Sequence, residues 1–346
     1  MIDGDGNRRK LLKITSIHKE YRMHKAIRFH EVGGPEVLKW EDVEVVDPGP
    51  GEVRIRHEAI GVNFVDLYQR NGLYKVPLPA IAGNEGAGVV EVIGTGVTGV
   101  KVGDRVAYAG RVGSYCEVRN IPADRLCILP DELSFEQGAV MMLKGLTVQY
   151  LIRRTHRVQK GETVLFHAAA GGVGIIATQW LKALGATIIG TAGSAEKCAL
   201  ALQHGADYCI NYRTENIVER VREITNGKGV PVVYDSVGKD TFEASLKCLS
   251  PRGLLVSFGN ASGPVPPVDL SLLAQHGSLY VTRPTLATYI AERADLEAAA
   301  HELFDIVRAG TMGIDINQRY HLRDAAQAHI DLESRKTTGS SIMLPR

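Results

Sequence analysis

The chain has 346 residues, of which 45% are hydrophobic and 23% are charged. This length is typical of roughly two domains, and the composition is typical of a globular protein rather than a disordered one. Forty Lys and Arg residues against 39 Asp and Glu leave a formal net charge of +1, and no apolar run is long enough to span a bilayer, so we expect neither a nucleic-acid nor a membrane partner.

Residues 1–22 are polar and irregular, with a basic cluster at Arg8, Arg9, Lys10 and Lys13. They contain neither the apolar stretch nor the small-residue cleavage site of a signal peptide. We interpret them as a disordered or artefactual extension, with the folded protein beginning near Met23. The alternative is a nucleic-acid-binding arm.

Residues 23–147 contain short runs of alternating polar and apolar residues, such as 53–56, 88–93 and 105–108, which are separated by Gly and Pro. This pattern predicts a mostly-β domain with twisted, bulged strands.

The pattern changes in residues 148–286, where apolar strands alternate with segments of helical periodicity. The expected strands are 163–167, 187–191, 207–210, 232–235, 254–258 and 279–282. Strands and helices that alternate at this spacing predict an α/β domain with a doubly wound parallel sheet.

Residues 287–346 continue with helices expected near 289–309 and 323–334 and a terminal strand at 341–344. This strand is far from the strand–helix series, so we expect it to return to the first domain. The predicted catalytic domain is therefore discontinuous, comprising 23–147 and 287–346.

The turn after the first parallel strand has the sequence Ala-Ala-Ala-Gly-Gly-Val-Gly at residues 168–174. Glycines at such a turn let a pyrophosphate approach the backbone at the N-terminus of the following helix. Ala169 takes the place of the first glycine of the dinucleotide fingerprint, and Gly171 and Gly174 take the other two. We expect Gly172 and Val173, in the same turn, to contact the cofactor as well. The alternative is a tight turn without a ligand.

The second parallel strand ends in Gly193 and Ser194, and no acidic residue occurs before Glu196, inside the next helix. An NAD site usually has an acidic residue here to bind the ribose hydroxyls. Lys197, Tyr212 and Arg213 lie nearby instead. A cation without a competing carboxylate favours the 2′-phosphate of NADPH, although Lys197 as an ordinary solvated helix residue is the alternative.

Four motifs, at residues 83–90, 103–108, 145–147 and 233–238, together with the Ala-rich turn, resemble the medium-chain dehydrogenase/reductase superfamily. The resemblance is to its zinc-independent NADPH:quinone oxidoreductase (zeta-crystallin-like) family. It covers nearly everything from Met23 onward and implies a GroES-like catalytic domain beside a Rossmann domain.

The resemblance also allows the zinc-ligand positions of the superfamily to be examined in this sequence. Asn63 stands where zinc alcohol dehydrogenases have a Cys ligand, and Asn84 stands where they have a His ligand. Neutral amides are poor zinc ligands, so we expect no metal. No two of the five cysteines are two to four residues apart, which argues against a zinc ribbon and favours reduced thiols in a cytoplasmic protein.

The resemblance implies a catalytic loop with Asn63, Asp66, Tyr68 and Tyr74 beside the nicotinamide. Asn63 would contact the cofactor ribose or the substrate oxygen, Tyr68 would donate a hydrogen bond or a proton through water, and Tyr74 would line the pocket. Asp66 either orients its neighbours or caps a turn. The resemblance also implies cofactor contacts from Ser236, Phe258, Gly259 and Arg335, although a surface cation at a helix end is the alternative for Arg335. Lys144 is a further candidate, with simple capping of the cleft as its alternative.

The segment 278–283 resembles the edge strand through which family members pair, which predicts a homodimer. The leading functional hypothesis is NADPH-dependent quinone reduction without a metal. The alternatives are reduction of enones or alkenals, and a non-catalytic NADPH-binding protein that is crystallin-like or binds RNA.

Overall fold

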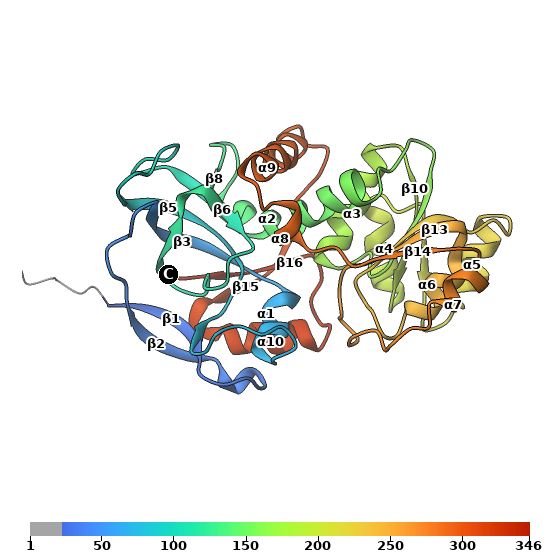
Figure 1. The fold of residues 1–346 in the computed structure, drawn as a ribbon, viewed down its shortest axis with the longest axis horizontal. Coiled ribbons are helices and arrows are strands. Elements are labelled where there is room, and N and C mark those ends of the chain that lie inside the picture. Colours follow the sequence, from blue (N-terminus) through green and yellow to red (C-terminus); the bar gives the residue numbers. More distant parts are fainter. Residues whose placement is uncertain (1–22) are drawn as a thin grey trace, which may run out of the picture.

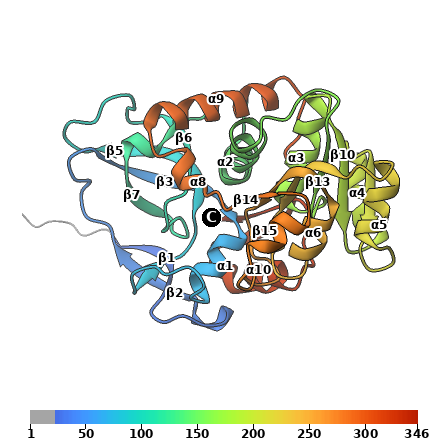
Figure 2. The ribbon, with the colours of Figure 1, turned by 45° about the vertical axis from the view of Figure 1, so that its right-hand side comes forward.

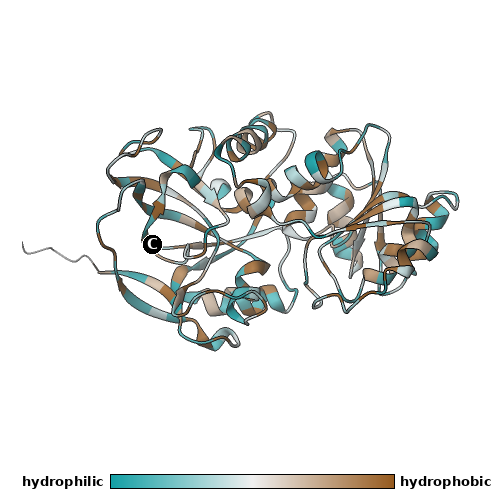
Figure 3. Ribbon diagram, in the orientation of Figure 1, coloured by the Kyte–Doolittle hydropathy of each residue, from teal (hydrophilic) through white to brown (hydrophobic). Residues whose placement is uncertain are grey.

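The computed structural model describes residues 23–346, which form a β-rich lobe and a lobe built around a parallel sheet (Figure 1). The interpretation of residues 1–22 lies outside the described residues. Hydrophobic residues are concentrated along the strands of both lobes (Figure 3). Within the described part of the chain, no helix combines the length and the apolar character needed to cross a membrane.

The parallel sheet has six strands in the order β11-β10-β9-β12-β13-β14. Their bounds are β9 Thr163–Phe166, β10 Thr187–Ala192, β11 Tyr208–Asn211, β12 Val230–Asp235, β13 Leu249–Ser257 and β14 Tyr280–Thr282. The order reverses between β9 and β12, as in dinucleotide-binding folds. The central strand β9 has a continuous buried apolar run at 164–166, as expected where helices cover both faces. The predicted doubly wound sheet is confirmed.

Helices alternate with these strands along the chain (Figure 2). They are α3 Gly172–Ala183, α4 Ala195–Gln203, α5 Ile217–Ile224, α6 Phe242–Cys248 and α7 Ser271–Gln275. In α3, Ile176, Trp180 and Leu181 are all buried, as expected for a helix whose apolar residues recur with helical periodicity.

The β-rich lobe contains two sheets, one with the order β2-β1-β4 and one with the order β15-β16-β3-β5-β6-β8, in which β7 also pairs with β3. The bounds are β1 Met23–Phe29, β2 Lys39–Glu44, β3 Glu52–Val62, β4 Ala80–Ile81, β5 Glu85–Ile93, β6 Arg105–Ala109, β7 Val118–Pro122, β8 Cys127–Ile128, β15 Ile316–His321 and β16 Ser340–Leu344. Alternate side chains of β3 are buried, which explains its alternating sequence.

The C-terminal strand β16 pairs with β3, at the register Ser341 to Val62. The remaining helices are α1 Phe64–Arg70, α2 Phe135–Tyr150, α8 Leu286–Tyr289, α9 Arg293–Arg308 and α10 Ala325–Glu333, with a π-helical turn at Leu151–Thr155. Helix α2 contacts β3 of one lobe and α3 of the other. The domain boundaries at 147 and 286 stay predictions.

Candidate cofactor and active site

The turn between β9 and α3 is held in a tight conformation. Ala168 has a φ of +55°, and a Cβ at Gly174 would lie 2.4 Å from the carbonyl oxygen of Ala168. Ala169 is fully buried, and its Cβ would lie 2.7 Å from a Cβ at Gly190. The small residues therefore bring α3 close to the sheet, so that its N-terminal N–H groups lie at the strand ends.

A Cβ at Gly171 would meet only one atom within 4 Å, the Ala168 carbonyl oxygen at 3.3 Å. A Cβ at Gly172 would lie 2.9 Å from Cε of Lys144. This brings the Lys144 side chain, from α2, to the start of α3 beside the predicted pyrophosphate contact.

The end of β10 gathers the residues predicted for the cofactor phosphate. A Cβ at Gly193 would lie 2.4 Å from the Tyr212 hydroxyl, so the phenol packs directly on the backbone there. Ser194 is the N-cap of α4, and its Oγ accepts a hydrogen bond from the Lys197 backbone N–H at 3.3 Å.

The Lys197 ammonium contacts the segment that follows α10. Its Nζ donates to the backbone carbonyl of Arg335 at 2.8 Å. Burial lowers the pKa of Lys197, and the charges of Arg335 and Arg213 lower it further. Because like charges at Arg335 and Arg213 disfavour the Lys197 ammonium, an anion bound here would be stabilised by relieving that repulsion.

The carboxyl ends of β12 and β13 lie close together. A Cβ at Gly259 would lie 2.3 Å from the carbonyl oxygen of Ser236, and the ring of Phe258 lies 5.9 Å from that of Phe166. In doubly wound sheets the ligand lies outside these strand ends. The structure thus brings Ser236, Phe258 and Gly259 together.

Asn63 precedes α1 and is fixed by a buried ion pair. Its Nδ2 donates to Oε1 of Glu85 at 2.7 Å, and Nζ of Lys144 donates to the same oxygen at 2.9 Å. The second oxygen of Glu85 accepts from the Leu143 backbone N–H at 2.8 Å. All three residues are at most 5% exposed, so the orientations of their side chains are strongly restricted.

Asp66 is buried and accepts three hydrogen bonds, from the Asn63 backbone N–H at 2.8 Å, from Asn84 at 2.7 Å and from the Tyr115 hydroxyl at 2.8 Å. Burial raises its pKa to about 6. These hydrogen bonds cap α1 and orient Asn84 and Tyr115. The carboxylate of Asp66 is buried and is not open to the cleft.

Tyr68 and Tyr74 pack edge to face, with ring centroids 5.2 Å apart, and both contact the other lobe. The Tyr68 hydroxyl accepts from the Asn260 backbone N–H at 3.2 Å, and the Tyr74 hydroxyl accepts from Nη2 of Arg283 at 2.9 Å. Burial raises the pKa of Tyr68 to about 12, so its phenol is neutral at pH 7.

A cleft of about 530 Å³ opens beside Tyr68, and Tyr74, which we expected to line the pocket, is not among its lining residues. It is lined by residues of both lobes: Phe64, Leu67, Tyr68, Asn71, Gly72, Leu73, Asn260, Ala261, Gly263, Pro264 and Glu333. The mostly apolar lining suits a planar organic ligand.

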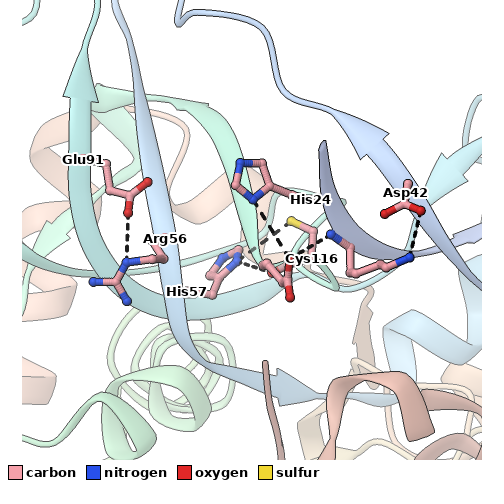
Figure 4. A network of polar contacts seen from close by, with 8 residues as sticks. His24, Asp42, Arg56, His57, Glu91 and Cys116 are labelled. Carbon is pink, nitrogen blue, oxygen red and sulfur yellow. Dashed lines mark hydrogen bonds and ion pairs between the residues drawn. The ribbon is translucent and has the colours of Figure 1, made fainter. Parts of the chain in front are cut away.

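The histidine nearest to Cys116 has a packing role. His57 is buried, and its Nδ1 lies 2.7 Å from the carbonyl oxygen of Cys116 (Figure 4). Its Nε2 lies 2.8 Å from the Tyr108 hydroxyl. Burial lowers its pKa to about 3. Among residues 23–346, no group of three metal-binding side chains occurs. The metal-free site stays a prediction.

Sequence reasoning did not find Glu85, Asn260 or Arg283. Asn260 follows β13 and Arg283 follows β14, so the rule that ligands lie at the carboxyl ends of parallel strands was the available signal. Arg283 was instead included in the predicted dimer edge.

Two family profiles match the chain, one for the alcohol dehydrogenase GroES-like domain at residues 49–162 and one for the zinc-binding dehydrogenase at residues 172–304. A quinone oxidoreductase of Pseudomonas aeruginosa is 57% identical over 93% of this chain and 100% of its own length. The chain belongs to the quinone oxidoreductase family of the medium-chain dehydrogenases/reductases. The predicted fold class, a GroES-like domain with a Rossmann domain, is also confirmed.

Other members of the superfamily are similar over the same length. The crystal structure of Escherichia coli quinone oxidoreductase complexed with NADPH has a TM-score of 0.92 and 54% identity, covering 93% of this chain and 100% of that one. A 2-haloacrylate reductase of Burkholderia sp is 45% identical over 94% of this chain and 100% of its own length.

Proposed function

We propose that this oxidoreductase catalyses NADPH-dependent reduction of quinones without a metal. One observation carries the cofactor assignment: Lys197 lies in the first turn of α4, directly after β10, with its Nζ 2.8 Å from the Arg335 backbone carbonyl, where an NAD site usually has a carboxylate. The NADPH complex of the Escherichia coli relative supports the same choice.

The residues present fit this cofactor. The turn at 168–174 admits a pyrophosphate, and Gly193, Ser194, Lys197, Tyr212 and Arg335 would hold the phosphate-bearing ribose. Ser236, Phe258 and Gly259, at the ends of β12 and β13, would contact the nicotinamide end. NADPH, when bound there, supplies a hydride from nicotinamide C4.

The chain's own contribution is orientation and stabilisation of charge. A quinone is already a ready electrophile, so its oxygen needs only hydrogen-bond donors as it becomes negative. Tyr68 lines the cleft and would donate such a bond, and Asn63, fixed by Glu85, would contact the cofactor ribose or the substrate.

Reduction of an activated carbon–carbon double bond is the second candidate. The observation that favours it is the 45% identity to 2-haloacrylate reductase. The same hydride donor and the same phenol serve an enone, whose carbonyl oxygen becomes negative in the same way.

Steady-state oxidation of NADPH with a small quinone and with an enone, compared as kcat/KM, tests the assignment. We expect the quinone to give the larger value, and NADH to be the poorer donor. A larger value for the enone would replace the leading assignment, and absence of turnover with both, in folded protein that binds NADPH, would overturn it.

The proposed assembly is a cytoplasmic homodimer that pairs through residues 278–283. Tyr280 and Val281 on the edge strand β14 are 62% and 41% exposed, and an exposed apolar edge favours strand pairing. We expect a dimer in light scattering after gel filtration at micromolar concentration. A monomer at that concentration would refute the proposal.

A further inference from the structure

A chain of buried polar side chains runs from the end of β12 to the start of the β9–α3 turn. Asp235, the last residue of β12, accepts from the Ser245 hydroxyl of α6 at 2.9 Å. The Ser245 oxygen lies 3.0 Å from Nε2 of His167, which directly follows β9, and Nδ1 of His167 lies 3.0 Å from Oγ1 of Thr191 in β10. That oxygen accepts from the Ala168 backbone N–H at 3.3 Å. All four residues that supply side chains are at most 1% exposed, so they bond to one another rather than to bulk water.

The number of protons available fixes the direction of each bond in this chain. Ser245 has one hydroxyl proton and donates it to Asp235, so its oxygen accepts from His167 Nε2–H. At the other end, the Thr191 oxygen accepts from a backbone N–H and has its own proton left for His167 Nδ1. Burial lowers the pKa of His167, so the ring is neutral at pH 7 and carries one proton. His167 is therefore held in the Nε2–H tautomer.

The chain ends at the residue that begins the cofactor turn. Ala168 has a φ of +55°, a left-handed conformation that a residue with a Cβ keeps only where its surroundings fix it. Its N–H is bonded to Thr191. Its carbonyl oxygen accepts from the Gly171 N–H at 3.0 Å and lies against Gly174. The two peptide units of Ala168 therefore fix the start of α3 relative to the sheet.

Asp235 also holds a second segment predicted to contact the cofactor. Its Oδ1 accepts from the backbone N–H groups of Val237 at 2.8 Å and Gly238 at 3.0 Å, which turns the chain at Ser236. The Thr241 hydroxyl lies 2.9 and 2.8 Å from the two carboxylate oxygens. One buried carboxylate thus holds the end of β12 directly and reaches the β9–α3 turn through the histidine.

We propose that His167 is a positioning residue for the cofactor: its Nε2–H tautomer connects Asp235 to Thr191 and so holds the β9–α3 turn in the conformation that binds the pyrophosphate. His167 itself does not touch the cofactor, because it is fully buried. This role rests on the proposed function, since it requires a dinucleotide at the turn. The pyrophosphate is common to NADPH and NADH, so the network affects both equally, unlike Lys197 at the proposed 2′-phosphate site.

The test compares Thr191→Val, which removes the hydroxyl at nearly constant volume, with Thr191→Ser, which retains it. Ser245→Ala and the double variant Thr191→Val/Ser245→Ala examine the other side of His167. Thr178→Val is the matched control, because Thr178 is another fully buried threonine of the Rossmann lobe and donates to the Ile175 carbonyl at 3.1 Å, inside α3. For each variant the dissociation constants of NADPH and NADH are measured by fluorescence titration, and folding by thermal melting without cofactor.

We expect Thr191→Val to raise the dissociation constants of NADPH and NADH by the same factor, roughly tenfold, the size of one buried hydrogen bond. Thr191→Ser should recover most of the loss. Ser245→Ala should raise both constants as well, but it should add little in the Thr191→Val background, because the chain is already broken there. Thr178→Val should lower the melting temperature and leave both constants within about twofold of wild type.

The tautomer gives a second measurement. Nitrogen NMR of protein with isotope-labelled histidine, in which His167→Gln assigns the signals, should show His167 neutral at pH 7 with its proton on Nε2. A proton on Nδ1, or a doubly protonated ring, would overturn the inference.

Three binding results would also overturn it. These are a lower melting temperature of Thr191→Val with unchanged affinity, a changed ratio of the two dissociation constants in that variant, and equal weakening of both cofactors by Thr178→Val. If Thr191→Val does not fold, Ser245→Ala decides by the same criterion. Failure of the folded wild type to bind NADPH would instead overturn the proposed function, and this inference with it.

Discussion

The Lys197 ammonium donates to the backbone carbonyl of Arg335 across 2.8 Å, which joins α4 of the Rossmann lobe to the segment that follows α10. The two residues are 138 positions apart in the chain. The proposed phosphate site is therefore built from both lobes, and an anion bound there would hold the lobes together.

Replacing Lys197 tests this site. We expect Lys197→Ala to lower the preference for NADPH over NADH roughly tenfold, about 1.4 kcal/mol, because the 2′-phosphate loses a charge-assisted partner. The ratio of the two dissociation constants, measured by fluorescence titration, gives the result. Lys247→Ala, on an exposed side chain of α6, is the control, and an unchanged ratio in Lys197→Ala would exclude the phosphate assignment.

The glycines of the β9–α3 turn provide a matched pair. A Cβ at Gly174 would lie 2.4 Å from a backbone oxygen, whereas one at Gly171 would meet only a contact of 3.3 Å. We expect Gly174→Ala to lower the melting temperature by several degrees, since the helix must move. Gly171→Ala should melt close to wild type in the absence of cofactor. Equal melting of the two variants would contradict this packing.

Asp66 gives a pH dependence of stability. Burial raises its pKa from 3.8 to about 6, so the folded protein binds this proton more tightly than the unfolded chain does. The contribution to stability is present below pH 4 and is lost as pH rises to 6. Asp66→Asn does not titrate, so the free energy of unfolding of wild type relative to this variant should fall by up to about 3 kcal/mol between pH 4 and 6.5.

Urea unfolding across this pH range, without cofactor, measures the difference. Asp269→Asn is the control, because hydrogen bonds to Ser271 lower the pKa of that exposed carboxyl and its titration lies below the range. A constant difference between wild type and Asp66→Asn would show that folding does not raise the pKa of Asp66.

The Glu85–Lys144 ion pair should matter for stability as well as for Asn63. Both side chains are almost fully buried, so Lys144→Met leaves an uncompensated carboxylate and should lower the free energy of unfolding by about 3 kcal/mol. The double variant Glu85→Gln/Lys144→Met removes that charge and should regain part of the loss. Urea unfolding at pH 7 checks both values, and a double variant less stable than Lys144→Met would refute the explanation.

Local features of the sequence are sufficient to predict the strands and helices of the Rossmann lobe. The six predicted strands are present because a continuous apolar run and the helix that follows it are both set by nearby residues. The glycine turn at 168–174 is predictable for the same reason. The small residues that let a pyrophosphate approach the backbone all lie within these seven positions. Asn63, Asp66, Tyr68 and Tyr74 came from the resemblance, and their catalytic roles stay predictions.

What the sequence determined by itself is therefore the alternation of strands and helices and the chemistry available at each strand end. Only the tertiary structure decided which of these groups meet. Arg283 and Tyr74 are 209 residues apart, and Glu85 and Lys144 are 59 apart. Periodicity carries no information over such separations, because these contacts arise only when the two lobes and α2 pack together and fix side chains that each segment leaves free.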